Sequence, residues 1–130
     1  MKDLCTSVRR KARLITEIRY PASPRLFDIR GKIIESIKPE IGSHLGHWRT
    51  DIGTISFVDD LEKPKQEFII SLKRTAIGIE DFGTVQEFVD RTKKYLDLMY
   101  EHLGSHIMLL DRCGVRLIEI CSPSDSDNFE

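Results

Sequence analysis

The chain has 130 residues, of which 40% are hydrophobic and 32% charged, and its formal net charge is −1. This size and balance indicate one globular domain, and the near-zero charge excludes a global attraction to nucleic acid or to an anionic membrane. No apolar run approaches the roughly 18 residues of a membrane span, and the N-terminus lacks the apolar core of a signal peptide. We therefore expect a cytoplasmic protein without membrane contact, whose three cysteines stay reduced.

The first third of the chain predicts an arm, a strand and a helix. Residues 1–12 are polar and basic and are predicted to form a basic N-terminal arm. Residues 13–20 alternate apolar and polar side chains, which is typical of a half-buried strand. Residues 24–38 then follow the helical period, with a proline at the first helical position. The helix is predicted to end before Pro39, because proline disfavours helical backbone at the preceding residue.

The middle of the chain predicts strands. Residues 48–58 are interpreted as one strand with a bulge at Gly53, because the alternation changes phase there. Residues 68–72 form a further predicted strand, and residues 76–82 are its pairing partner or its continuation.

The last third predicts a capped helix and a strand pair. Thr84 and Glu87 have the T-x-x-E spacing of a capping box, and apolar residues recur at helical spacing from there to residue 103. Residues 107–110 and 115–120 are then predicted to be strands around a turn at 111–114. The final segment, 122–130, has the composition of a disordered acidic tail.

Together these elements predict an α+β fold in the order β-α-β-β-β-α-β-β. The expected architecture is a mostly antiparallel sheet of five to six strands with two helices packed on one face, because one shared face buries both apolar helix stripes. We expect a single domain over residues 13–121, preceded by the arm and followed by the tail.

Two short motifs resemble those of a sporadically distributed, uncharacterised prokaryotic protein family. Residues 17–21 read E-I-R-Y-P, similar to its E-I-R-[FY]-P opening, and residues 112–118 read R-C-G-V-R-L-I, similar to its R-x-G-[VL]-R-[YL]-I strand. The resemblance covers roughly residues 13–121. Typical members are about twice as long, so the likeness is to their N-terminal part. It supports the fold outline and implies no activity, and it draws attention to a few charged and glycine positions: Glu17, Arg19, Arg112, Gly114 and Arg116.

The predicted ligand-binding residues are Arg19, Arg112, Cys113 and Arg116. The three arginines could converge on an anion if the segments that carry them lie side by side. Neighbouring positive charge also stabilises a thiolate, which would make Cys113 reactive. A small buried side chain is the more frequent role of such a cysteine, and we favour it.

Two further groups of residues are weaker candidates. The basic residues Arg9, Arg10, Lys11 and Arg13 could contact the phosphates of a nucleic acid, but only 8% of the residues are aromatic and none in this segment forms a stacking pair. A solvated basic face is the expected alternative. His44, His47 and Asp51 are ligand types that hold zinc. They number only three with no cysteine nearby, so we favour exposed loop histidines over a metal site.

No catalytic motif is found, so an enzyme is not favoured, and we predict no catalytic residues and no cofactor. The leading hypothesis is a non-catalytic interaction module that associates with itself as a homodimer. Two helices on one face leave the other sheet face to solvent or to a partner, and the last predicted strand is apolar on both sides. The alternative is a protein that binds a small ligand or a nucleic acid through an arginine-lined sheet face.

Overall fold

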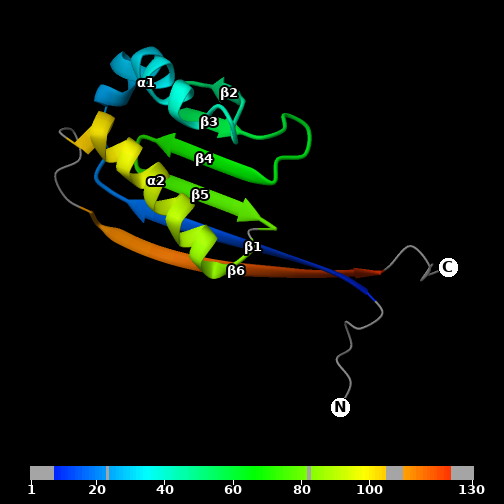
Figure 1. The fold of residues 1–130 in the computed structure, drawn as a ribbon. Helices are drawn as coiled ribbons and strands as arrows, with labels where there is room; N and C mark the ends of the chain where they lie inside the picture. The colour runs from blue at the N-terminus through cyan, green and yellow to red at the C-terminus, as the bar shows by residue number, and fades with distance from the viewer. Residues whose placement is uncertain (1–7, 23, 82, 105–109, 124–130) are drawn as a thin grey trace.

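The computed structural model describes residues 8–22, 24–81, 83–104 and 110–123. Figure 1 shows both helices on the same side of a twisted sheet. The elements in chain order are β1 (Val8–Arg19), α1 (Arg25–Ile41), β2 (His47–Thr50), β3 (Thr54–Val58), β4 (Gln66–Ser71), β5 (Arg74–Glu80), α2 (Val85–Leu103) and β6 (Arg112–Pro123). The six strands lie in the order β2-β3-β4-β5-β1-β6, and all five neighbouring pairs are antiparallel. The predicted α+β class is confirmed.

The core lies between the helices and the sheet. Strands β1, β3, β4 and β5 send every second side chain toward the helices, and those side chains meet one stripe of α1 and one of α2. Phe68 on β4 packs between Phe57 on β3 and Tyr95 on α2, with ring centroids 5.8 and 5.2 Å apart. Each large apolar side chain that is fully buried stabilises the fold by roughly 1.5–3 kcal/mol. The completely buried members of this core cluster are Ile37, Ile41, Ile55, Phe57, Phe68, Ile70, Ile77, Ile79 and Met99.

Helix α1 runs past Pro39 and ends at Ile41, so the predicted stop before the proline is wrong. Pro39 lies in the last helical turn, where its missing N–H removes one hydrogen bond. Beyond it, Ile41 is fully buried and Leu45 is almost fully buried in the core. Burial of these two side chains outweighs the lost hydrogen bond and the restriction on Lys38.

Helix α2 begins with the predicted capping box. The Thr84 hydroxyl accepts a hydrogen bond from the Glu87 backbone N–H at 3.1 Å, and the Glu87 carboxylate accepts one from the Thr84 N–H at 3.3 Å. The preceding Gly83 has a φ of +75°, and a Cβ there would lie 2.0 Å from the Glu87 carboxylate. Glycine therefore gives the chain room to enter the capping box.

The segment predicted as one strand over residues 48–58 is two strands, β2 and β3, joined by a tight turn. In this turn Gly53 donates its N–H to the Asp51 side chain at 3.1 Å, an arrangement typical of Asx turns. The phase change at Gly53 is thus a hairpin and not a bulge. Neither described helix has the length and apolar character needed to cross a membrane.

The ends of the sheet also differ from the prediction. Strand β1 begins at Val8, so residues 8–12 belong to the sheet and not to an arm. Strand β6 begins at Arg112 and continues to Pro123, so residues 112–114 are strand where a turn was predicted. Residues 107–109 of the predicted strand at 107–110, and residues 124–130 of the predicted tail at 122–130, lie outside the described residues. Leu110 is described and is not part of a strand.

Replacement of Tyr95 by phenylalanine should raise the free energy of unfolding by about 1 kcal/mol, because a buried hydroxyl without a partner costs roughly 1–3 kcal/mol. Tyr95 is 1% exposed, and its hydroxyl has no hydrogen-bond partner among the described residues. Burial raises the pKa of Tyr95 to about 12. The change Tyr95→Phe keeps the ring on Phe68 and removes the buried polar atom, and urea denaturation would measure the gain.

Tyr20→Phe is the matched control, because the Tyr20 hydroxyl donates to the Ser71 carbonyl at 2.8 Å and lies 2.9 Å from the Thr75 hydroxyl. This change should lower the free energy of unfolding by about 1–3 kcal/mol. An equal decrease in the free energy of unfolding in the two variants would contradict the conclusion that the Tyr95 hydroxyl has no hydrogen-bond partner.

Candidate functional site

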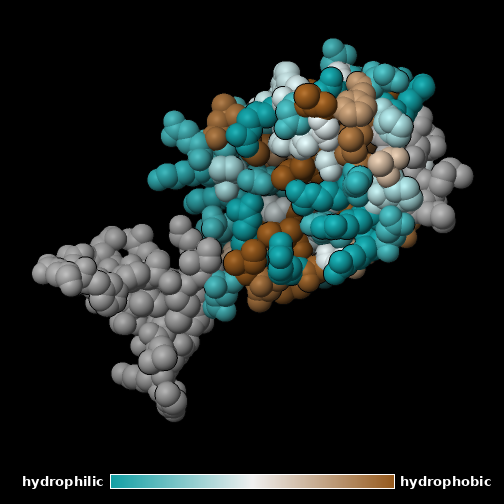
Figure 2. Space-filling model, turned by 180° about the vertical axis from the view of Figure 1, so that it is seen from behind, coloured by the Kyte–Doolittle hydropathy of each residue, from teal (hydrophilic) through white to brown (hydrophobic). Residues whose placement is uncertain are grey.

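The face of the sheet opposite the helices is open. On β1 the buried Thr16 and Ile18 point to the core, so Ile15, Glu17 and Arg19 lie on this open face. Figure 2 views the molecule from this side and shows hydrophilic side chains with smaller apolar patches between them. Such a mixed surface is typical of an antiparallel sheet with one solvated face.

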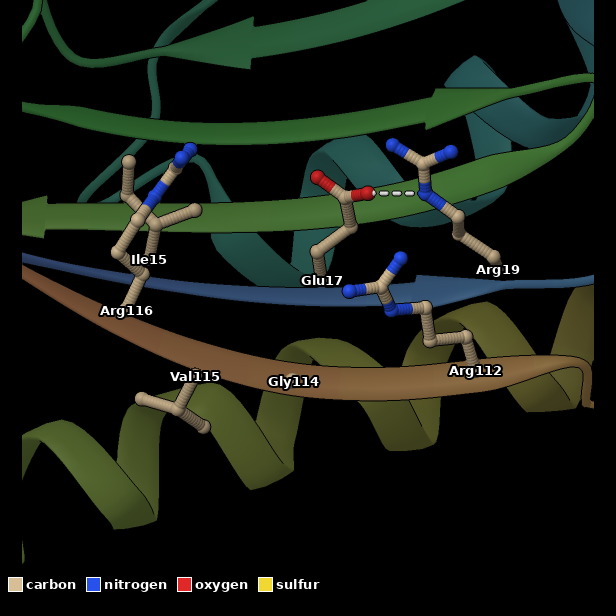
Figure 3. A pocket seen from close by; sticks show the side chains of 7 residues that line it. All are labelled: Ile15, Glu17, Arg19, Arg112, Gly114, Val115 and Arg116. Carbon is tan, nitrogen blue, oxygen red and sulfur yellow. Dashed lines mark hydrogen bonds and ion pairs between the residues drawn. The ribbon is translucent and has the colours of Figure 1, made fainter.

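A cavity of about 300 Å³ lies on this face, between β1 and β6 (Figure 3). In the strand register Arg19 is opposite Arg112, and Glu17 is opposite Gly114. Gly114 contributes no side chain, which leaves the floor of the cavity open beside Glu17. The structure thus brings together the three arginines singled out by the sequence. The cavity is lined by Ile15, Glu17, Arg19, Arg112, Gly114, Val115 and Arg116.

Glu17 is the acidic residue of this cavity, and it holds two arginines. Its carboxylate lies 2.6 Å from Arg19 Nε and 3.2 Å from an Arg74 guanidinium nitrogen. The hydrogen bond from Arg19, together with the charges of Arg19 and Arg74, lowers the pKa of Glu17, and partial burial opposes this shift. Glu17 therefore stays ionised at neutral pH. Neither Arg112 nor Arg116 forms an ion pair with any other described residue.

Arg74 joins this group although nothing in the sequence pointed to it. It lies on β5 directly opposite Arg19. The signal that could have found it is the cross-strand register of β1 and β5, which depends on tertiary pairing and not on local pattern.

Cys113 does not line the cavity. It follows Arg112 on β6, and neighbouring residues of a strand point to opposite faces. Its side chain is exposed, so the favoured interpretation of Cys113 as a buried residue is wrong. On the helix side it lies near Tyr100 of α2, whose pKa is raised mainly by burial and further by Cys113.

The basic segment at the start of the chain is part of the sheet. Arg9, Arg10 and Lys11 belong to β1 and pair with residues 120–122 of β6. The Arg13 side chain lies 3.6 Å from the Glu67 carboxylate. It crosses Gly78, where a Cβ would come within 3.1 Å of the guanidinium group. Arg13 of β1 therefore reaches across its neighbour β5 to pair with Glu67 on β4.

The candidate zinc ligands do not form a site. Within the described ranges, no three His, Cys, Asp or Glu side chains lie close enough together to hold a metal ion. His44 lies in the turn after α1, and His47 begins the edge strand β2. Asp51 accepts the Gly53 N–H in the β2–β3 turn.

The molecule is thus an α+β protein with one helix-covered and one arginine-bearing sheet face. No family model matches the chain, and neither does any curated protein. One similar solved structure is a crystal structure of a NIPSNAP family protein of unknown function from Agrobacterium tumefaciens. It is 13% identical, with a TM-score of 0.39, over 90% of this chain and 93% of that chain. A second crystal structure of that protein is 12% identical, with a TM-score of 0.35, over 83% of this chain and 90% of the other. These likenesses assign neither a family nor an activity.

The ion pairs of Glu17 predict a pH-dependent stability. The folded-state pKa lies below the ordinary value of 4.5, so the stabilisation is fully present above that value and is lost as the pH falls below it. Glu17→Gln should therefore lower the free energy of unfolding by about 1 kcal/mol at neutral pH. Urea denaturation at neutral pH and at about pH 3 should show the difference from the native chain shrinking in acid.

Glu62→Gln is the control for this measurement, because Glu62 is exposed in the β3–β4 loop and forms no ion pair with a described residue. If Glu17→Gln lowered the free energy of unfolding equally at neutral pH and in acid, the ionic explanation would be ruled out.

Proposed function

We propose that this protein is a non-catalytic interaction module that associates with itself as a two-fold homodimer through β6. The observation that carries this proposal is that β6 forms an edge of the sheet while exposing large apolar side chains. Val115 is 63% exposed and Leu117 is 58% exposed.

The two edges of the sheet differ in length. Strand β2, at one edge, has four residues, whereas β6, at the other, has twelve. Very short edge strands protect a sheet from pairing with another chain, and a long edge strand with apolar side chains promotes it. The β6 edge is therefore the one suited to association.

Helix α2 extends the apolar surface beside β6. Val85, Val89 and Tyr100 recur at helical spacing on one flank of α2, and each is at least 39% exposed. Tyr100 is near Cys113 of β6, so this flank faces the edge strand. We call this region the β6–α2 surface; it comprises Val85, Val89, Tyr100, Val115 and Leu117. Exposed large apolar side chains gathered on adjacent elements are typical of an interaction site.

A second copy of the chain is the simplest partner for this surface. Two β6 strands can pair antiparallel about a two-fold axis, so that the same patch of each copy contacts the other. The sheet would then continue across the axis, and the backbone groups of both edges would be satisfied. The proposed module works without a cofactor, and its exposed free thiol at Cys113 is suited to a reducing compartment such as the prokaryotic cytoplasm.

Leu117→Lys should dissociate the dimer, because a lysine there would place a charge in the apolar interface. We expect the native chain to sediment as a dimer and the variant to have a dissociation constant at least about tenfold higher, the effect of roughly 1.4 kcal/mol. Sedimentation velocity over a range of concentrations would measure both. The variant should still fold, because Leu117 is already more than half exposed within one chain.

Ile52→Lys is the matched control, since Ile52 is 79% exposed in the β2–β3 turn, outside the β6–α2 surface. A native chain that stays monomeric at all soluble concentrations would refute the proposal, as would equal dissociation by both variants.

A further inference from the structure

Three arginines lie in a row across neighbouring strands of the open face. Arg74 on β5 is opposite Arg19 on β1, which is in turn opposite Arg112 on β6. Neighbouring strands are about 4.8 Å apart, and like charges directly opposite one another destabilise a sheet. This arginine row therefore opposes folding at two adjacent cross-strand pairs.

The positive charge extends into two cavities that share Arg19. The second cavity, of about 360 Å³, is lined by Gly53, Ser71 and Leu72 in addition to Arg19, Lys73 and Arg74. Across both cavities five lining residues are basic and only Glu17 is acidic. The chain as a whole has a net charge of −1, so this excess of positive charge is a local feature. The basic residues are Arg19, Lys73, Arg74, Arg112 and Arg116.

Glu17 organises the arginines but does not neutralise them. It engages Arg19 and Arg74 at 2.6 and 3.2 Å, while Arg112 and Arg116 have no ion-pair partner among the described residues. Figure 3 shows the guanidinium groups of Arg19 and Arg112 on the same side of the strands as the Glu17 carboxylate, with Val115 pointing away. Each guanidinium has five N–H donors, so most of the donors of this group remain available to a ligand.

We propose that the arginine row binds a small anion of the phosphate class with at least two negative charges, of which a diphosphate is the simplest form. Guanidinium groups match phosphate oxygens bidentately, and an anion between them would remove the repulsion along the row. Two cavities on either side of Arg19 suit two phosphoryl groups. Their volumes of about 300 and 360 Å³ are those of a small-molecule site.

The same face is poorly suited to nucleic acid. Single strands bind where aromatic side chains alternate with a basic track, and no aromatic residue lines either cavity as described. Arg13, the next arginine along β1, is already engaged by Glu67. The basic surface is therefore local, as a small ligand requires.

Calorimetric titration of the full chain with inorganic pyrophosphate, at about 50 mM salt to limit screening, tests the proposal. We expect saturable binding that Arg112→Gln weakens at least about tenfold. Arg112 contributes to the row without pairing with Glu17, so its removal leaves the Glu17 ion pairs intact. Arg49→Gln is the matched control, because Arg49 is an exposed arginine on the opposite edge strand, and its binding should equal that of the native chain.

Thermal unfolding provides a second readout that also confirms folding of the variants. Pyrophosphate should raise the melting temperature of the native chain by binding the folded state, and it should do so far less for Arg112→Gln. Without ligand, Arg112→Gln should melt at a slightly higher temperature than the native chain, because one repulsive cross-strand pair is gone.

Absence of pyrophosphate binding up to about 10 mM, where even a site of millimolar affinity would be mostly occupied, would overturn the proposal. Equal weakening of binding by Arg49→Gln would overturn it as well. Tighter binding of citrate than of pyrophosphate would assign the site to carboxylates. Tighter binding of a single-stranded oligonucleotide, lost in Arg112→Gln, would assign it to nucleic acid. Either result refutes the phosphate class. The arginine row lies within one chain, so Leu117→Lys should bind pyrophosphate as the native chain does. Pyrophosphate binding by Leu117→Lys thus tests this proposal independently of the proposed dimer.

Discussion

The double pairing of β1, with β5 on one side and β6 on the other, is the constraint on which the rest of the structure depends. Side chains alternate along a strand, so this pairing sends Thr16 and Ile18 into the core and sets Glu17 and Arg19 on the open face. A slip of one residue would exchange the two sets. The apolar core and the charged cavity are therefore two consequences of a single register.

Buried contacts hold the register against the repulsion of the arginine row. At the end of β1, Tyr20 is 3% exposed, and its hydroxyl bonds the Ser71 carbonyl and the Thr75 hydroxyl. These bonds fix β1 to the β4–β5 hairpin, beside Arg19 and Arg74. Hydrogen bonds in such a buried site are costly to break, whereas repulsion between exposed charges is partly screened by solvent. The buried hydrogen bonds thus allow the fold to tolerate a row of arginines whose mutual repulsion is destabilising.

Features set within one segment of the chain could be predicted from the sequence, whereas features set by pairing between distant segments could not. Helix α2 was readable because its capping box and apolar spacing lie within one segment. The full extent of β1 could not be predicted from the sequence, because residues 8–12 are strand only through pairing with β6. At the site, Arg19, Arg112 and Arg116 followed from short motifs, but Arg74 depends on cross-strand register. Cys113 was misassigned because the segment was interpreted as a turn, in which neighbouring side chains can share a side.

Strand β6 contributes residues both to the β6–α2 surface and to the arginine row. Its arginines therefore restrict how a second copy can pair with it. Charged residues on an edge strand usually discourage pairing. A pairing centred on Arg116 would set two arginines directly opposite one another, which is unfavourable. A pairing centred on Leu117 instead sets the two leucines together on the helix side and places each Arg116 opposite Ile118 of the other copy. The charges therefore select one register of the proposed dimer over its neighbour, while the apolar side chains on the other side supply the attraction.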